Sequence, residues 1–224
     1  EFSDRDMYEV VVEGPEYVTG VRSEPKSKTH HTSGEGNRST LEDTDTQTHA
    51  LRKFLNLAMS GNPTPMAALY APGELYETLT PSGAILVTYR GLFTTKKAVR
   101  THAMMLHSHI QTLIGARNKR TNRPELEHLH GYDTKWGYHA IRVGFLGLQL
   151  AKTGEYHLPF EGEAFNTCMA IRNGEVPKDD LLSMATSMQL QIESLVEASK
   201  MPDEPNIAAI SAMSHKIYLQ EWDS

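Results

Sequence analysis

Ser3-Asp4-Arg5-Asp6 opens the chain immediately ahead of Met7-Tyr8-Glu9-Val10-Val11-Val12-Glu13, a strand-like stretch. Side chains two residues apart on an extended backbone project from the same face, so the carboxylates of Asp4 and Asp6 should point toward one spot. Such oxygen ligands suit Mg²⁺, which usually binds one or two protein carboxylates and keeps its other positions for water and phosphates. Asp-x-Asp also occurs in solvated turns and helix caps, so this tetrapeptide alone identifies no site.

A third acid, Asp45, lies in the threonine-rich, β-prone stretch Thr44-Asp45-Thr46-Gln47-Thr48, which leads directly into a helix. A strand beside the first one would place Asp45 next to Asp4 and Asp6. Three carboxylates on adjacent strands can hold two metal ions roughly 3.5–4 Å apart, the arrangement used for in-line attack at phosphorus. We expect the nearby Asp43 to cap the chain locally or to face solvent instead.

The composition is that of a globular chain. Its 224 residues, 39% of them hydrophobic, can bury a core as one large domain or two small ones. The formal net charge of -6 argues against nucleic-acid binding through the whole surface but not against a local basic patch. The single cysteine, Cys168, predicts a buried helix position and a reducing, cytoplasmic compartment, and no apolar run is long enough to span a bilayer. No initiator methionine precedes Glu1, so we expect the natural protein to begin upstream.

Hydrophobic periodicity predicts a mainly helical chain after Asp45. Between Ser23 and Thr44 the only aliphatic residue is Leu41, which predicts a long mobile connection in which His30-His31 has no assigned role. Gly61-Asn62-Pro63 is a helix stop signal. The expected helices cover about 51–59, 65–70, 94–114, 132–150, 163–172, 177–198 and 206–221, with a short strand at 155–158.

The helix expected at about 132–150 carries a row of cationic and hydrogen-bonding groups. Lys135, His139 and Arg142 follow one another at i, i+4 and i+7 with no acid between them, and Asp133 is placed to cap the helix. A triphosphate is the partner that suits such a row, while an ordinary exposed stripe is the alternative. A core-facing stripe runs beside it, made of Trp136, Ala140, Val143, Gly147 and Leu150.

The chain has one dense basic cluster, consisting of Arg117, Lys119, Arg120 and Arg123. It is either a solvated turn or a patch that steers a triphosphate or a polynucleotide toward the acids. The histidines of the expected helix 94–114 lack the i, i+4 spacing of a metal pair on one face, so we expect surface or supporting positions for them. These are His102, His107 and His109.

In this order, the segments resemble the predicted nucleotidyltransferases of the DNA polymerase beta superfamily. The resemblance runs from Ser3 to about 202–205 and implies an α+β, helix-rich fold, with a small nucleotidyltransferase-type β-sheet followed by a C-terminal helical bundle. We expect a partial, palm-like nucleotidyltransferase domain over 1–72 and a helical domain packed on it over 73–224. The segments that carry the resemblance are Ser3-Asp4-Arg5-Asp6, Asp45 running into Leu51-Arg52-Lys53-Phe54-Leu55, Gly61-Asn62-Pro63, and Gly131-Tyr132-Asp133-Thr134-Lys135 with His139 and Arg142.

The resemblance also implies roles for residues. Asp4 and Asp6 would bind both metal ions, Mg²⁺ or Mn²⁺, and Asp45 would bind the catalytic ion and help deprotonate the incoming hydroxyl. Ser3 and the row Lys135, His139 and Arg142 are the expected nucleotide-binding residues. The family's Gly-Ser element, which precedes the Asp-x-Asp motif and grips the nucleotide phosphates, would lie upstream of Glu1.

The leading hypothesis is a metal-dependent nucleotidyltransferase that moves a nucleoside monophosphate from an NTP, such as ATP, to a hydroxyl and releases pyrophosphate. An RNA end, a protein side chain and a small metabolite all stay open as the acceptor, as does the oligomeric state. The main alternative is a non-catalytic nucleotide-, RNA- or protein-binding module on the same fold. A metal-dependent phosphohydrolase is a weaker reading, because paired His-Asp spacing is absent.

Overall fold

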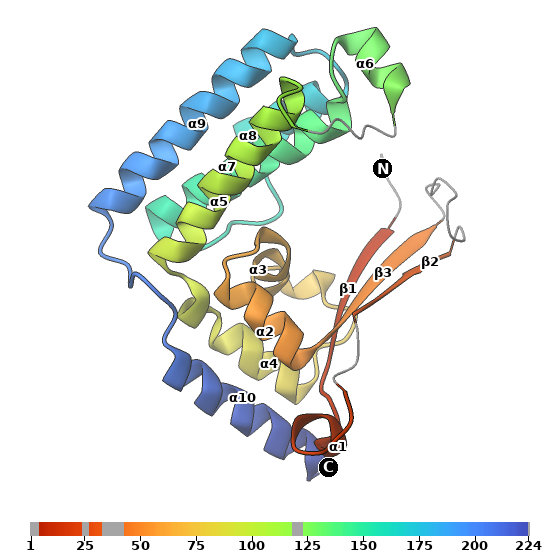
Figure 1. Cartoon of the computed structure of the whole chain (residues 1–224), viewed down its shortest axis with the longest axis vertical. Helices are drawn as coiled ribbons and strands as arrows, with labels where there is room; N and C mark the ends of the chain where they lie inside the picture. The colour runs from red at the N-terminus through yellow and green to blue at the C-terminus, as the bar shows by residue number, and fades with distance from the viewer. Residues whose placement is uncertain (1–4, 24–26, 33–42, 118–122, 224) are drawn as a thin grey trace.

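A computed structural model describes residues 5–23, 27–32, 43–117 and 123–223. It confirms a helix-rich α+β fold, in which a three-stranded mixed sheet near the N-terminus is followed by a packed helical region (Figure 1). The elements, in chain order, are β1 Arg5–Val11, α1 Pro15–Val18, β2 Lys28–His31, β3 Thr44–Ala50, α2 Leu51–Met59, α3 Pro63–Leu69, η1 Gly73–Leu75, α4 Pro81–Thr88, η2 Arg90–Phe93, α5 Lys96–Leu113, α6 Pro124–His130, α7 Thr134–Thr153, α8 Gly162–Arg172, α9 Lys178–Ala198 and α10 Ile207–Trp222.

The sheet has the strand order β1-β3-β2, with β1 parallel and β2 antiparallel to β3. The first strand begins two residues earlier than the sequence predicts and ends at Val11. The expected connection over 23–44 is wrong at 28–31, where the polar stretch Lys28–His31 pairs with β3 as an edge strand. Because its side chains are exposed, this strand depends on backbone pairing with β3 and leaves no hydrophobic pattern in the sequence.

The connection from the sheet to the helices is short. β3 ends at Ala50 and α2 starts at Leu51, with Leu51, Phe54, Leu55 and Ala58 buried, as the helical spacing predicts. Gly61, with φ near +74°, ends the helical turn, and the Asn62 side chain accepts a hydrogen bond from the Thr64 amide at the start of α3. The stop signal over 61–63 is therefore confirmed.

The helical region is built around α7, which packs against α5, α8 and α9. Small residues let its neighbours approach closely: a Cβ added at Gly144 would lie 2.7 Å from the Met188 sulfur, and one at Gly147 would lie 2.8 Å from Cδ1 of Ile192. Cys168 is buried in α8, as predicted. Burial raises the pKa of its thiol to about 11, so the sulfur is a neutral packing group.

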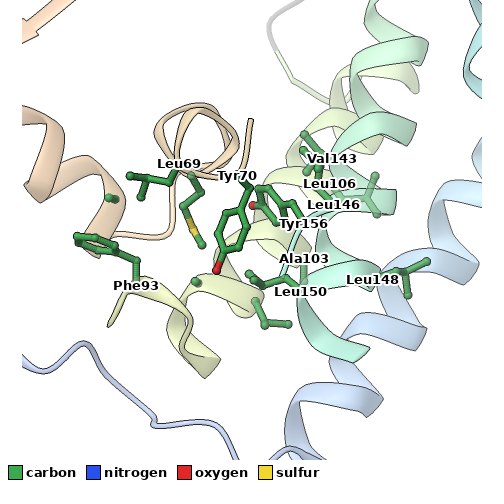
Figure 2. Packing of buried hydrophobic residues seen from close by; sticks show 14 of the residues in the cluster. Leu69, Tyr70, Phe93, Ala103, Leu106, Val143, Leu146, Leu148, Leu150 and Tyr156 are labelled. Atoms are coloured by element: carbon green, nitrogen blue, oxygen red, sulfur yellow. The ribbon is translucent and has the colours of Figure 1, made fainter. Parts of the chain in front are cut away.

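Tyr156 does not belong to a strand, so the short strand expected at 155–158 is wrong. Its ring lies in the core beside that of Tyr70, with centroids 5.3 Å apart (Figure 2). Its hydroxyl forms a hydrogen bond with the buried His102 of α5. This contact joins the segment after α7 to the helices that follow the sheet. Tertiary packing, rather than strand pairing, holds the segment. Three short α-helices, α1, α4 and α6, have no counterpart in the predicted set.

The C-terminal helix α10 returns to the N-terminal part of the chain, where Figure 1 shows it beside α1. The Tyr218 hydroxyl donates to Oε2 of the buried Glu13 over 2.8 Å, and the indole N–H of Trp222 donates to the Glu13 carbonyl over 2.9 Å. The division at residue 72 stays a prediction. None of the helices that the structure describes is long and apolar enough to cross a membrane.

Candidate functional site

Asp6 and Asp45 are register partners on the neighbouring parallel strands β1 and β3. Paired residues on adjacent strands project their side chains from the same face of a sheet, so both carboxylates lie on one face near the start of the strands. Asp6 is exposed and Asp45 is partly buried. Ser3 and Asp4 lie outside the described residues, so this part of the expected acidic group has no structural description.

His31 flanks Asp45 from the other side. It is the register partner of Asp45 on β2, and its Nδ1 lies 2.8 Å from Oδ1 of Asp45. Asp6, Asp45 and His31 therefore form a row across all three strands. Asp43 lies next to this row but bonds elsewhere, because its Oδ1 accepts a hydrogen bond from the Thr32 hydroxyl over 2.9 Å.

The same face of the sheet continues into the core through Tyr8 and His49. Their rings lie 5.1 Å apart, and His49 Nδ1 lies 2.6 Å from the Ser27 hydroxyl. Burial, helped by the charge of Lys53, lowers the pKa of His49, and burial raises the pKa of the Tyr8 hydroxyl. The row of Asp6, Asp45 and His31 thus lies at the solvent-accessible end of this face, and the neutral side chains of Tyr8 and His49 pack together toward its other end.

The donor set of this row fits a divalent cation only in part. No group of three or more His, Cys, Asp or Glu side chains among the described residues is arranged to hold a metal ion. Two carboxylates on adjacent strands nevertheless match what Mg²⁺ takes from proteins, namely one or two carboxylates with water and phosphates completing the shell. Asp6 and Asp45 are thus compatible with a metal that a substrate helps to bind.

The cationic row lies on the first half of α7, where Lys135, His139 and Arg142 are all partly buried. Asp133 caps this helix, as the sequence predicts, by accepting hydrogen bonds from the Lys135 and Trp136 amides. Arg123 joins the row through an ion pair of 3.5 Å between its Nη1 and Oδ2 of Asp133. Of the basic cluster, Arg117 and Arg123 are described, whereas Lys119 and Arg120 lie outside the described residues.

The His139 side chain lies in a positively charged environment. Burial lowers its pKa to about 4, and the charges of Arg142, Lys135, His109 and Arg123 add to the effect, in that order. His139 is therefore neutral near pH 7 and is surrounded by cations. An anion bound here would meet guanidinium and ammonium donors together with an imidazole able to take up a proton.

His109 and Trp136 form a part of this region that sequence reasoning missed. Their rings meet edge to face with centroids 5.0 Å apart, and burial lowers the pKa of His109. His109 Nδ1 and Trp136 Nε1 are buried and lack a hydrogen-bond partner within the described part of the chain. The spacing along one helix carries no signal of this contact, since the two residues come from α5 and α7.

The two sets of residues come from different parts of the fold. In the view of Figure 1, the end of the sheet where β1 and β3 begin is turned toward α6 and the helical region. In this view, Asp6 and Asp45 therefore lie near the end of the sheet that is turned toward α6, the helix immediately before α7.

A comparison with models of known protein families gives a match over nearly the whole chain. The family model described as RlaP, the RNA repair pathway DNA polymerase beta family, matches residues 1–212. Searches of curated proteins and of solved structures each found no match. Since the match spans the sheet, the cationic helix and the beginning of α10, the chain belongs to the RNA repair pathway DNA polymerase beta family.

Proposed function

We propose that the protein is a divalent-metal-dependent nucleotidyltransferase that moves a nucleoside monophosphate from an NTP to a hydroxyl and releases pyrophosphate. Membership of a polymerase beta family supports the reaction class. The observation that carries the proposal is the register pairing of Asp6 with Asp45, which brings two carboxylates from distant parts of the sequence to one face of the sheet.

Asp4, Asp6 and Asp45 would hold the metal, Mg²⁺ or Mn²⁺. When bound, the metal would supply charge neutralisation at the phosphates and at the attacking and leaving oxygens. Asp45 would also accept the proton of the attacking hydroxyl, a role that its partly buried position beside His31 supports. The catalytic work of the chain is then mainly positioning of the acceptor and of the α-phosphorus.

Lys135, His139 and Arg142 would contact the triphosphate, with Ser3 near the Asp-x-Asp motif as a further nucleotide contact. The lowered pKa of His139 supports this role, because the same cations that disfavour its protonation favour a bound anion. Arg117, Lys119, Arg120 and Arg123 would steer the triphosphate or a polynucleotide toward the site. We further propose that 1–72 is the nucleotidyltransferase part and that 73–224 is the helical part that presents these cations.

An RNA hydroxyl is the acceptor that we propose, because the family belongs to an RNA repair pathway. The chain has a net charge of -6 and a local basic cluster. A local cluster is suited to binding the end of an RNA, whereas binding along a long duplex would need a more extensive basic surface. A protein side chain or a small metabolite would then accept label poorly.

The test is transfer of label from an α-labelled NTP to RNA oligonucleotides, a protein pool and small metabolites by the full-length protein with Mg²⁺. Asp45→Asn should lower transfer by roughly 10²-fold or more, since it removes charge at the reacting centre. Asp43→Asn is the matched control, because Asp43 bonds to Thr32, and it should keep parental activity. Transfer by Asp45→Asn at the parental rate would refute the assignment.

Calorimetry with NTP separates this proposal from the non-catalytic binding module. Binding that strengthens with Mg²⁺ and weakens in Asp45→Asn supports the enzyme. Equal NTP affinity with and without Mg²⁺, in the absence of any transfer, would favour the module.

A further inference from the structure

His109 of α5 and Trp136 of α7 each carry one buried ring nitrogen that the structure leaves without a partner in the ranges it describes. These atoms are Nδ1 of His109 and Nε1 of Trp136. The two rings meet edge to face, with centroids 5.0 Å apart. An indole N–H can only donate, and a buried donor without an acceptor destabilises the folded protein. A ligand that supplies the acceptor would remove this penalty.

The pair borders the cationic row of α7. Trp136 lies three residues before His139, and residues at that spacing are neighbours on a helix surface. His109 lies close enough to His139 for its charge to lower the pKa of that imidazole. Both His109 and Trp136 are only partly buried. Rotation of the two rings, rather than separation of α5 from α7, is therefore the movement that would present their nitrogens to a ligand on the row.

The pair is neutral, in contrast to the row. Burial lowers the pKa of His109 and so keeps its imidazole uncharged near neutral pH, and an indole carries no charge. A phosphate is held best by guanidinium and ammonium groups such as those of the row. A flat, uncharged ring suits the aromatic pair, because its face packs on side-chain rings and its edge forms hydrogen bonds. A nucleobase is a group of this kind.

We propose that Trp136 and His109 bind the nucleobase of the NTP and set the preference among nucleotides. This rests on the proposed function, in which the row on α7 contacts the triphosphate. The indole N–H would donate to a ring nitrogen or a carbonyl oxygen of the base, and Nδ1 of His109 would bond to the neighbouring group on the same edge. A base with the wrong order of donor and acceptor would leave one of the two nitrogens unpaired, which is the physical basis of the preference.

Calorimetry on the full chain tests this by comparing ATP, GTP, CTP, UTP and inorganic tripolyphosphate, each with Mg²⁺ and without an acceptor. The parent should bind its preferred nucleotide at least about tenfold more tightly than the weakest of the four. Trp136→Phe keeps an aromatic ring and removes the N–H. It should lower the affinity for the preferred nucleotide by about tenfold or more and leave that for tripolyphosphate unchanged. Trp222→Phe is the matched control, because its N–H already donates to the Glu13 carbonyl, and it should bind all five ligands as the parent does.

The indole N–H signal of Trp136 gives a second readout that does not depend on the folding of Trp136→Phe. The chain has two tryptophans, so its NMR spectrum has two indole signals, and Trp222→Phe identifies the one that belongs to Trp136. The preferred NTP should shift this signal further than tripolyphosphate does, because only the NTP carries a base.

Two results would overturn the proposal. One is an equal shift of the Trp136 signal with the NTP and with tripolyphosphate, which would make the pair a phosphate contact. The other is parental affinity of Trp136→Phe for all four nucleotides, and a loss of RNA affinity in its place would assign the pair to the acceptor. Nucleotide binding that depends on Trp136, without any nucleotide transfer by the parent, would contradict the proposed function and leave this inference standing. Transfer that depends on Asp45, with an unchanged nucleotide preference in Trp136→Phe, would do the reverse.

Discussion

Removing the hydroxyl group of Tyr218, which contacts Glu13 just after the end of β1, should destabilise the whole protein. Tyr218 of α10 donates a hydrogen bond of 2.8 Å to Oε2 of Glu13, whose other oxygen accepts from the Arg52 amide at the start of α2 over 3.2 Å. Glu13 is only 4% exposed, so water cannot easily replace a lost donor. Tyr218→Phe keeps the ring and removes only this donor.

The expected magnitude follows from the charge and burial of the acceptor. A hydrogen bond to a charged group contributes about 1.5–3 kcal/mol to stability, and a buried acceptor left without its donor costs a similar amount. Tyr218→Phe should therefore lower the free energy of unfolding by about 1.5–3 kcal/mol. For a chain of this length, about 2–4 °C per kcal/mol corresponds to a Tm lower by roughly 3–12 °C.

Urea and thermal unfolding of the variant would measure this change, with Tyr89→Phe as the control because Tyr89 is 44% exposed. The control should stay within about 0.5 kcal/mol of the parent. A double-mutant cycle with Glu13→Gln should give a coupling energy of about 0.5–3 kcal/mol between the two positions. Equal stabilities of Tyr218→Phe and Tyr89→Phe, or a cycle with no coupling, would refute the role given to this contact.

Three further predictions follow from buried groups. Burial lowers the pKa of His102 to about 4. As the pH falls below about 6.5, this histidine takes up a proton in the unfolded chain before it does so in the folded protein. The free energy of unfolding should therefore decrease by about 3 kcal/mol between about pH 6.5 and pH 4. Urea unfolding at both pH values should show a smaller loss for His102→Gln. NTP with Mg²⁺ should raise the pKa of His139 from about 4, as followed by NMR of its ring, and an unchanged pKa would argue against a triphosphate there. Gly147→Ala should cost about 1–3 kcal/mol, because its Cβ would lie 2.9 Å from the His102 Cβ, whereas Gly91→Ala meets no atom within 4 Å and should be neutral in the same unfolding assay.

Elements with a strong local pattern could be predicted from the sequence. The apolar spacing from Leu51 to Ala58 marks α2, and Asp133 marks the start of α7 by its capping side chain. The strand around Asp45 follows from its threonines, and its place beside the first strand follows from the family resemblance. In each case the residues that determine the local structure lie within a few positions of one another.

Features that depend on distant contacts could not be predicted. β2 has no aliphatic residue and exists because its backbone pairs with β3, so the contact of His31 with Asp45 left no pattern. Glu13 reads as an ordinary strand-end acid, yet it is buried by a tyrosine 205 positions later in the chain. Tyr156 lies in the core through its bond to His102, although its neighbours suggest a short strand.

The geometry of the acids is determined at the opposite end of β3. Because side chains alternate along a strand, a slip of β3 by one residue against both β1 and β2 would move Asp45 to the other face, away from Asp6 and His31. The same slip would turn the buried His49 out of its contacts with Tyr8 and Ser27, and would displace the start of α2 from Glu13. The packed end of the sheet thus selects a single register, and that register places Asp6 and Asp45 on one face. Stability in the core and alignment at the site are therefore consequences of the same strand pairing.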